Sequence, residues 1–457
     1  MPGRRKLNST PRIAALLTLG CALLAAQTPA PQELEYLSQV VPLIQAGSLD
    51  EAQSKVQEGL KLFPHSAVLM NALGMTYERQ GKKSDAIEAY RQAVDWLPSF
   101  AAAQLHLASL LAANGACDQA VPLFVSTAHE INDAGALSTA GLGLAQCQNY
   151  SAAADALERA HSLNPSADAV TFNLALARFQ NHEMSSALET LNAMSQAESG
   201  SQPAVRFLRG KVMLALNQPG GTDLMASACR SQPAEDFCND TAIALIRNGH
   251  FREAADLLLP SLVTLGDSAA IRSTLGLAQF RLGQYKDAIA SYSKVSELDP
   301  GLSAPREGLG FLLYMTGDLE QARSVVEKAL SASADDFYLH YLRALILYRQ
   351  GRTQWAAALA SLGSAVDRAP TFAPAYFLRG KILMEQENIE AALADFKTAV
   401  KLDSKYALPY YKMSQIYQRL GRDQDAEQAR RRFDELGSRR EEEVLAAQAQ
   451  NQLLASH

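Results

Sequence analysis

The side chains that could do chemistry are dispersed along this chain of 457 residues. No two of its eight histidines stand at the i, i+4 spacing that binds a metal from one helix face. No H-E-x-x-H, G-x-S-x-G or phosphate-binding loop motif occurs. The acidic pairs Asp335–Asp336 and Glu441–Glu442 are expected in a loop and a charged tail, where carboxylates are normally solvated. The sequence therefore predicts no catalytic centre, no cofactor and no metal site.

The residues that recur regularly are small ones, and their period is 34 positions. Glycines that follow this period are Gly47, Gly81, Gly115, Gly249, Gly283, Gly317 and Gly351. A period of this size indicates one supersecondary unit copied many times, with each copy packed on its neighbours. Such an array has no single core, so its function must come from the surface that stacking creates.

One copy, residues 67–100, shows the unit clearly. Four residues at helical spacing share one face of a first helix: Met70, Leu73, Gly74 and Tyr77. Gly81 ends that helix, a second helix carries Ala86, Tyr90 and Ala93, and Pro98 closes the copy. This pattern resembles the tetratricopeptide repeat from about Glu33 to Phe433. The resemblance implies an all-α, right-handed superhelical solenoid of about eleven to twelve helix-turn-helix repeats.

Two positions of each copy are small for a packing reason, because antiparallel helices approach closely only where a side chain is missing. The pairs predicted to do this are Gly74 with Ala86, Gly276 with Ala288, Gly310 with Ala322, and Gly380 with Ala392.

The period loses register between Ala187 and Ala254, where Pro219, Gly220 and Pro233 interrupt a second helix. The predicted organisation is a signal peptide over 1–26, an N-terminal array over 27–218, a broken segment over 219–234, a C-terminal array over 235–436 and a capping helix or tail over 437–457.

The amino terminus resembles a secretory signal. Basic residues precede a short apolar run over 13–26, and small residues follow it, which places cleavage near Ala26. Gly20–Cys21 leaves lipidation of Cys21 as a weaker alternative. The leading compartment is the periplasm or exterior of a bacterium. No later segment is long and apolar enough to cross a bilayer, and the net charge of −6 disfavours nucleic acid.

Four cysteines remain after such a leader is removed. Cys117 and Cys147 lie in equivalent turns of successive copies, and Cys229 and Cys238 flank the break at Pro233. An even number of cysteines in an exported chain favours disulfides Cys117–Cys147 and Cys229–Cys238 over four free or buried thiols.

In the tetratricopeptide family, the first helix of each pair lines the concave side. On this face the C-terminal half carries aromatic and basic residues that would suit a peptide: Phe311, Tyr314, Tyr338, Tyr341, Tyr348, Arg349, Phe377, Lys381, Tyr411 and Lys412. The alternative is that the rings only pack between helices.

The sequence therefore favours a non-enzymatic scaffold that binds a protein or peptide through its groove. A structural subunit of a secretion, pilus or polysaccharide-export assembly is the alternative, and a glycan-binding or transferase-associated protein is a third.

Overall fold

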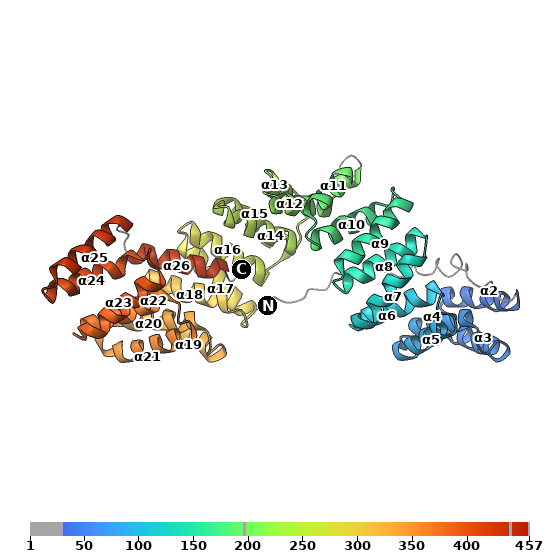
Figure 1. Ribbon diagram of the computed structural model, residues 1–457, viewed down its shortest axis with the longest axis horizontal. Helices are drawn as coiled ribbons and strands as arrows, with labels where there is room; N and C mark the ends of the chain where they lie inside the picture. Colours follow the sequence, from blue (N-terminus) through green and yellow to red (C-terminus); the bar gives the residue numbers. More distant parts are fainter. Residues whose placement is uncertain (1–30, 195–197, 438–440, 456–457) are drawn as a thin grey trace. The chain divides into compact units, whose positions relative to one another are not determined.

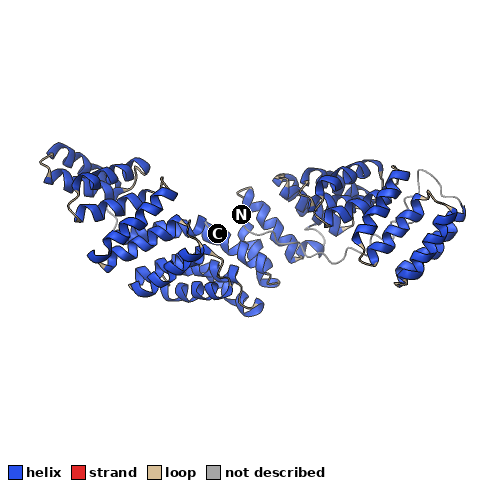
Figure 2. Ribbon diagram, turned by 90° about the horizontal axis from the view of Figure 1, so that it is seen from below, coloured by secondary structure: helices blue, strands red, loops and turns tan. Residues whose placement is uncertain are grey.

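The computed structural model is a series of helical hairpins (Figure 1). It describes residues 31–194, 198–437 and 441–455, so the predicted signal peptide and Cys21 lie outside the described residues. Every regular element within these ranges is an α-helix or a short 3-10 helix, as Figure 2 shows. The predicted all-α solenoid fold is confirmed.

The chain divides into two compact units, one ending at Leu224 and one beginning at Met225. The helices of the first unit are α2 (Pro31–Ala46), α3 (Leu49–Leu62), α4 (Ala67–Arg79), α5 (Lys83–Trp96), α6 (Ala101–Ala113), α7 (Cys117–Glu130), α8 (Ala134–Gln146), α9 (Tyr150–Leu163), α10 (Asp168–Gln180), α11 (Met184–Met194), η1 (Glu198–Ser201) and α12 (Pro203–Ala215). Helix α13 (Gly221–Ser231) contains the division.

The helices of the second unit are α14 (Glu235–Arg247), α15 (Phe251–Leu265), α16 (Ala269–Arg281), α17 (Tyr285–Leu298), α18 (Ser303–Thr316), α19 (Leu319–Ala332), α20 (Phe337–Gln350), η2 (Arg352–Gln354), α21 (Trp355–Arg368), α22 (Ala373–Glu385), α23 (Ile389–Leu402), α24 (Ala407–Arg419), α25 (Asp423–Leu436) and α26 (Glu441–Ala455).

Even-numbered helices from α2 to α24 are the first helices of their pairs, and they lie on the inner side of each unit. First helices pack on their own second helices, as α4 does on α5 and α22 does on α23, and on the neighbouring pair, as α6 does on α5. First helices of successive pairs also contact one another, as α6 does with α8 and α18 does with α20. Second helices make no comparable contacts with one another within the described residues. Each array therefore curves with its first helices inside.

Second-helix side chains, most of them aromatic, fill the space left by the small first-helix residues. A Cβ added to Gly74 would lie 2.5 Å from Tyr90 Cε1, and one added to Gly276 would lie 2.8 Å from Tyr292 Cε1. The same holds for Gly310 against Val326 (2.7 Å) and Gly380 against Phe396 (2.9 Å). The matching second-helix residues, Ala86, Ala288, Ala322 and Ala392, have no exposed surface. Missing side chains thus set the distance between the paired helices.

The turn between paired helices needs a left-handed backbone. Gly81 and Gly317 adopt φ values of +77° and +88° there. Where a copy lacks the glycine, another residue takes the same conformation: Gln148, His182, Asn217 and Glu387 have φ between +54° and +63°. The turn is therefore maintained even where a side chain makes it costly.

The stretch over 219–234 is helical in part. Helix α13 has 11 residues against 14 in α17 and α19, and it begins at Gly221, where an added Cβ would lie 2.8 Å from the carbonyl oxygen of Gly210. The division between the two units falls within this stretch.

The structure joins the four cysteines in the two pairs that the sequence favours. Cys117, the first residue of α7, is joined to Cys147, which directly follows α8, with Cα atoms 5.4 Å apart. Cys229 and Cys238 link α13 to α14, with Cα atoms 5.0 Å apart.

The carboxy-terminal helix lies elsewhere than expected. A cap over 437–457 would pack on the last pair, α24 and α25, yet α26 makes its extensive contacts with α16 and α18 (Figure 1). The physical reason is its single apolar face: Leu445, Ala449 and Leu453, at i, i+4 and i+8, are buried in the core of the second unit.

The first unit buries a histidine between two repeats. Tyr90 Oη donates to Glu78 Oε2 at 2.8 Å, and His106 Nδ1 lies 3.2 Å from the same hydroxyl. His106 Nε2 is buried without a hydrogen-bond partner among the described residues. Burial lowers the pKa of His106 from 6.5 to about 4, because a charged imidazole would lose its water there.

The fit at the small positions predicts opposite effects for one substitution at two glycines. Gly276→Ala should destabilise the second unit by about 1–3 kcal/mol, because the buried Tyr292 ring has no room to move. Gly363→Ala in α21 meets nothing within 4 Å and should stabilise its helix by about 0.5–1 kcal/mol. Native-state amide exchange measures both changes locally; equal effects at the two sites would contradict this packing.

Burial of His106 predicts a loss of stability in acid. The folded chain binds its proton only near pH 4, whereas the unfolded chain binds it near pH 6.5, so stability falls as pH drops through this window, by about 3 kcal/mol in total. His106→Gln removes this slope. Burial also raises the pKa of Glu78, which acts in the opposite direction but equally in both proteins. Urea unfolding of the two proteins at pH 4 to 7.5 measures the difference; parallel pH profiles would contradict a neutral buried His106.

Candidate functional site

Most of the aromatic residues predicted to line the groove are buried. Phe311, Tyr338, Tyr341 and Phe377 are at most 3% exposed, and Tyr314 is also buried. Tyr348 and Tyr411 are half-buried. The first five rings therefore offer little surface to a partner.

The buried rings contact residues that begin the next first helix. Phe372 precedes α22, and its ring centroid lies 5.1 Å from that of Tyr341 and 6.2 Å from that of Tyr338. Tyr406, before α24, is 5.2 Å from Phe377 in the same way. Phe311 packs on Phe280 of α16 at 5.8 Å. These contacts lie between successive repeats, which is the packing role that the sequence left open.

A second set of residues lies toward the carboxy-terminal ends of α18, α20 and α22, and all of them except Tyr314 stay partly accessible. We call this set the tyrosine–cation ladder: Tyr314, Tyr348, Arg349, Lys381 and Glu385. All five belong to first helices, so the ladder follows the inner side of the second unit.

Each step of the ladder joins one repeat to the next. Arg349 Nη1 donates to the carbonyl oxygen of Tyr314 at 2.8 Å, and its guanidinium lies 5.2 Å from the Tyr314 ring centroid. Lys381 Nζ lies 4.9 Å from the ring centroid of Tyr348, whose hydroxyl donates to Glu385 Oε1 at 2.6 Å. Two cations are thus held over aromatic rings, an arrangement that keeps them positioned for an anionic group.

Trp355 belongs to the same region and was missed as a site residue. Its ring stacks on Tyr348 with centroids 6.0 Å apart, and Arg352 lies 5.3 Å from its centroid. The short helix η2 (Arg352–Gln354) makes room for this stack. The sequence signal was the extra length of this copy, since Ala322 to Ala358 is two residues more than one period.

The other predicted pair lies at the last repeat. Lys412 Nζ and the Arg430 guanidinium lie 5.8 and 5.5 Å from the Tyr411 ring centroid, and Tyr411 packs on Phe433 of α25 at 5.2 Å. Tyr411 therefore packs on its own hairpin, away from the ladder.

The ionisable residues do not converge. Asp336 caps α20 by accepting from the backbone N–H groups of Tyr338 and Leu339, and Asp335 is fully exposed. Within the described ranges, no group of three His, Cys, Asp or Glu residues could hold a metal ion. Nor is any described helix long and apolar enough to cross a membrane.

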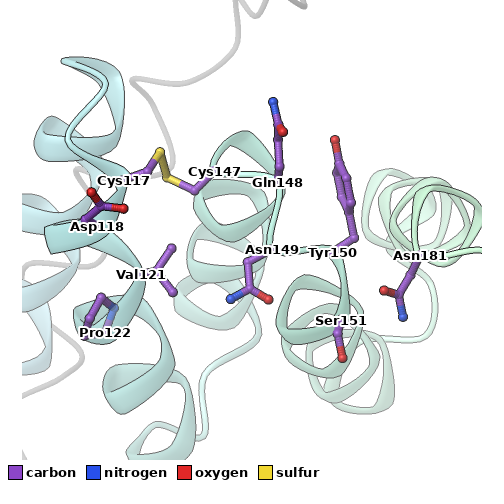
Figure 3. A pocket seen from close by; sticks show the side chains of 10 residues that line it. All are labelled: Cys117, Asp118, Val121, Pro122, Cys147, Gln148, Asn149, Tyr150, Ser151 and Asn181. Atoms are coloured by element: carbon purple, nitrogen blue, oxygen red, sulfur yellow. A yellow bond between two sulfur atoms is a disulfide. The ribbon is translucent and has the colours of Figure 1, made fainter.

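A shallow depression in the first unit lies beside the Cys117–Cys147 disulfide (Figure 3). It is lined largely by polar residues of α7 and α9 and of the turns that precede α9 and α11, including Asn149, Tyr150 and Asn181. Asp118 is the one charged residue of its lining, so it lacks the paired groups that acid–base chemistry needs.

Comparison with curated proteins finds short matches. The chain is 36% identical over 81 residues to the Probable biofilm formation methyltransferase WspC of Pseudomonas putida, which is 18% of this chain and 19% of that protein. It is 26% identical over 163 residues to human DnaJ homolog subfamily C member 3, covering 33% and 32%. The chain thus spans between about a fifth and a third of the length of these relatives.

Solved structures resemble it as folds. The APC/C hetero-tetramer Cut9–Hcn1 is 12% identical, with 92% of this chain and 97% of that chain covered and a TM-score of 0.43. A MamA double mutant is 23% identical, with 37% and 95% covered and a TM-score of 0.33.

Family models match along both units. One Tetratricopeptide repeat model matches residues 43–95, 71–128, 139–203 and 239–303; a second matches 279–346, and a TPR repeat model matches 380–421. The matches include the copies whose small residues and turns are described above. The chain belongs to the tetratricopeptide repeat family.

Proposed function

We propose that this chain is a non-enzymatic scaffold that binds a segment of another protein on the inner side of its second unit. The tyrosine–cation ladder is the observation that carries the proposal. Arg349 is exposed and Lys381 half-buried, and both are held over rings on the side where first helices lie. The carboxylates and imidazoles of the described residues are dispersed and form no catalytic acid–base pair, which supports a binding function over a catalytic one.

The ladder favours a partner segment with carboxylates. Arg349 and Lys381 supply N–H donors, and the half-buried ring of Tyr348, stacked on the buried Trp355, supplies an apolar surface beside them. Each charge-assisted hydrogen bond contributes about 1.5–3 kcal/mol. The structure does not favour contact through Tyr341 or Phe377, since these rings are already buried between repeats.

We further propose that the protein works outside the reducing cytoplasm, in the cell envelope. The basic and apolar leader supports this, as do two disulfides formed by all four cysteines of the described residues.

Crosslinking in the native host tests the binding face. A photoreactive phenylalanine analogue in place of Tyr348 should crosslink to one discrete protein, and the same analogue in place of Lys328, on second helix α19, should not. Arg349→Ala with Lys381→Ala should reduce the crosslinked product at least about tenfold, because two charge-assisted contacts are lost.

The matched control for this loss is Lys328→Ala with Lys401→Ala, which removes two exposed lysines from the second helices α19 and α23. Both double variants should unfold at the temperature of the parent chain. Equal losses in the two double variants, or equal crosslinking from positions 328 and 348, would contradict binding through the ladder.

Thiol chemistry tests the compartment. All four cysteines of the protein isolated from its host should resist alkylation until a reductant is added.

Replacing Cys117 and Cys147 together by Ser should destabilise the first unit by about 3–4 kcal/mol, because their separation of 30 residues closes a long loop. The closer pair Cys229 and Cys238, separated by 9, should cost about 2–3 kcal/mol. Four reactive thiols in the native protein would contradict an oxidising compartment.

A further inference from the structure

The inner side of the second unit already holds a helix, which is the chain's own carboxy-terminal helix. Helix α26 packs extensively against α16 and α18, two first helices of neighbouring repeats. In Figure 1 it lies beside these helices, although several repeats, α19 to α25, lie between α18 and α26 in the sequence. The surface formed by α16 and α18 therefore accepts a helix, because α26 is bound there.

Recognition of α26 is apolar and uses small residues for close approach. Leu445, Ala449 and Leu453 are buried at 6%, 0% and 0% exposure and belong to the core of the second unit. A Cβ added to Gly308 of α18 would lie 2.8 Å from Tyr292 Cε2 and 3.2 Å from Leu453 Cδ1, so the missing side chain of Gly308 leaves room for both residues. Nearer its start, Val444 packs on the core formed by α22 to α25. The site thus selects a helix with Leu, Ala and Leu at i, i+4 and i+8.

The contact that holds α26 is small. Its buried side chains are Leu445, Ala449 and Leu453, so release of α26 exposes a short apolar stripe rather than a whole core. The cost of release is small compared with unfolding of a repeat.

We propose that the inner face of α16 and α18 is a helix-binding site, and that α26 occupies it until a partner helix with the same Leu-x3-Ala-x3-Leu face displaces it. This inference rests on the proposed function, because it adds a helical contact beside Gly308 to the binding of a partner on the inner side of the second unit. A tethered helix has an effective concentration of the order of mM. With an intrinsic Kd of about 10 µM for α26 itself, the tethered helix would reduce the apparent affinity for a partner about 100-fold.

The experiment uses the full chain and a synthetic fluorescent peptide with the sequence of residues 441–455. Leu445→Asp with Leu453→Asp should release α26, which amide exchange detects as lost protection over 441–455. This variant should then bind the peptide at least about tenfold more tightly than the parent chain, measured by fluorescence anisotropy. A peptide with the same two substitutions should not bind.

A matched control separates release of α26 from a general effect of new charges. Leu402→Asp with Leu420→Asp makes the same change at two exposed leucines of the same unit, and it should leave peptide affinity at the parent value. If the release variant fails to fold, the parent chain still decides: saturating peptide should lower amide protection over 441–455.

The inference is overturned if the peptide binds no better to the release variant, or if the peptide leaves protection of α26 unchanged. It is also overturned if light scattering shows a dimer of the parent chain that the release variant lacks, since the occupant would then be a second copy's helix. Crosslinking through Tyr348 tests the proposed function separately, so loss of this inference would leave that result standing.

Discussion

The interlock between a small residue on each first helix and a large side chain on its second helix is the contact on which the rest of this structure depends. Tyr90, Tyr292, Val326 and Phe396 fill the spaces beside Gly74, Gly276, Gly310 and Gly380, and none of the four has exposed surface. The interlock fixes the distance within each pair, and stacking of pairs then places first helices together on the inner side. Because each repeat contacts only its neighbours, the inner surface is made one repeat at a time.

This dependence explains which features of the fold could be predicted from sequence. The interlock leaves a local signature, a glycine or alanine at fixed spacing from a ring, so the fold, the helix pairs and the cysteine pairing followed from the period. The turn after the first helix is less visible, since Gln148, His182 and Glu387 adopt the left-handed conformation that glycine marks elsewhere. The left-handed turn conformation therefore recurs more regularly along the chain than the glycine that usually accompanies it.

The candidate site was only partly predictable, because helical spacing identifies a face without saying what covers it. Phe311, Tyr341 and Phe377 lie on first helices as expected, yet Phe280, Phe372 and Tyr406 bury them between repeats. The residues that cover them lie at the ends of neighbouring helices, outside the periodic positions. Conversely, Tyr348 is only half-buried, and its ring stacks on Trp355, at the copy that is two residues longer. Residues outside the 34-residue period therefore determine which aromatic side chains are buried between repeats and which remain at the surface.

The same reasoning applies to α26, whose apolar face is too short to define a location from sequence. Three buried positions over nine residues satisfy a cap on the last hairpin as well as a groove several repeats away. What distinguishes the two is the receiving surface: α25 is highly charged, with Arg430, Arg431 and Arg432 paired to nearby carboxylates, whereas Gly308 of α18 leaves space for a leucine. A repeat array presents many nearly equivalent inner surfaces, so one missing side chain is enough to select the position of a helix. The same missing side chain would then select among partner helices, since a bulkier residue than leucine at that point would meet Tyr292, which packs against Gly308 from the other side.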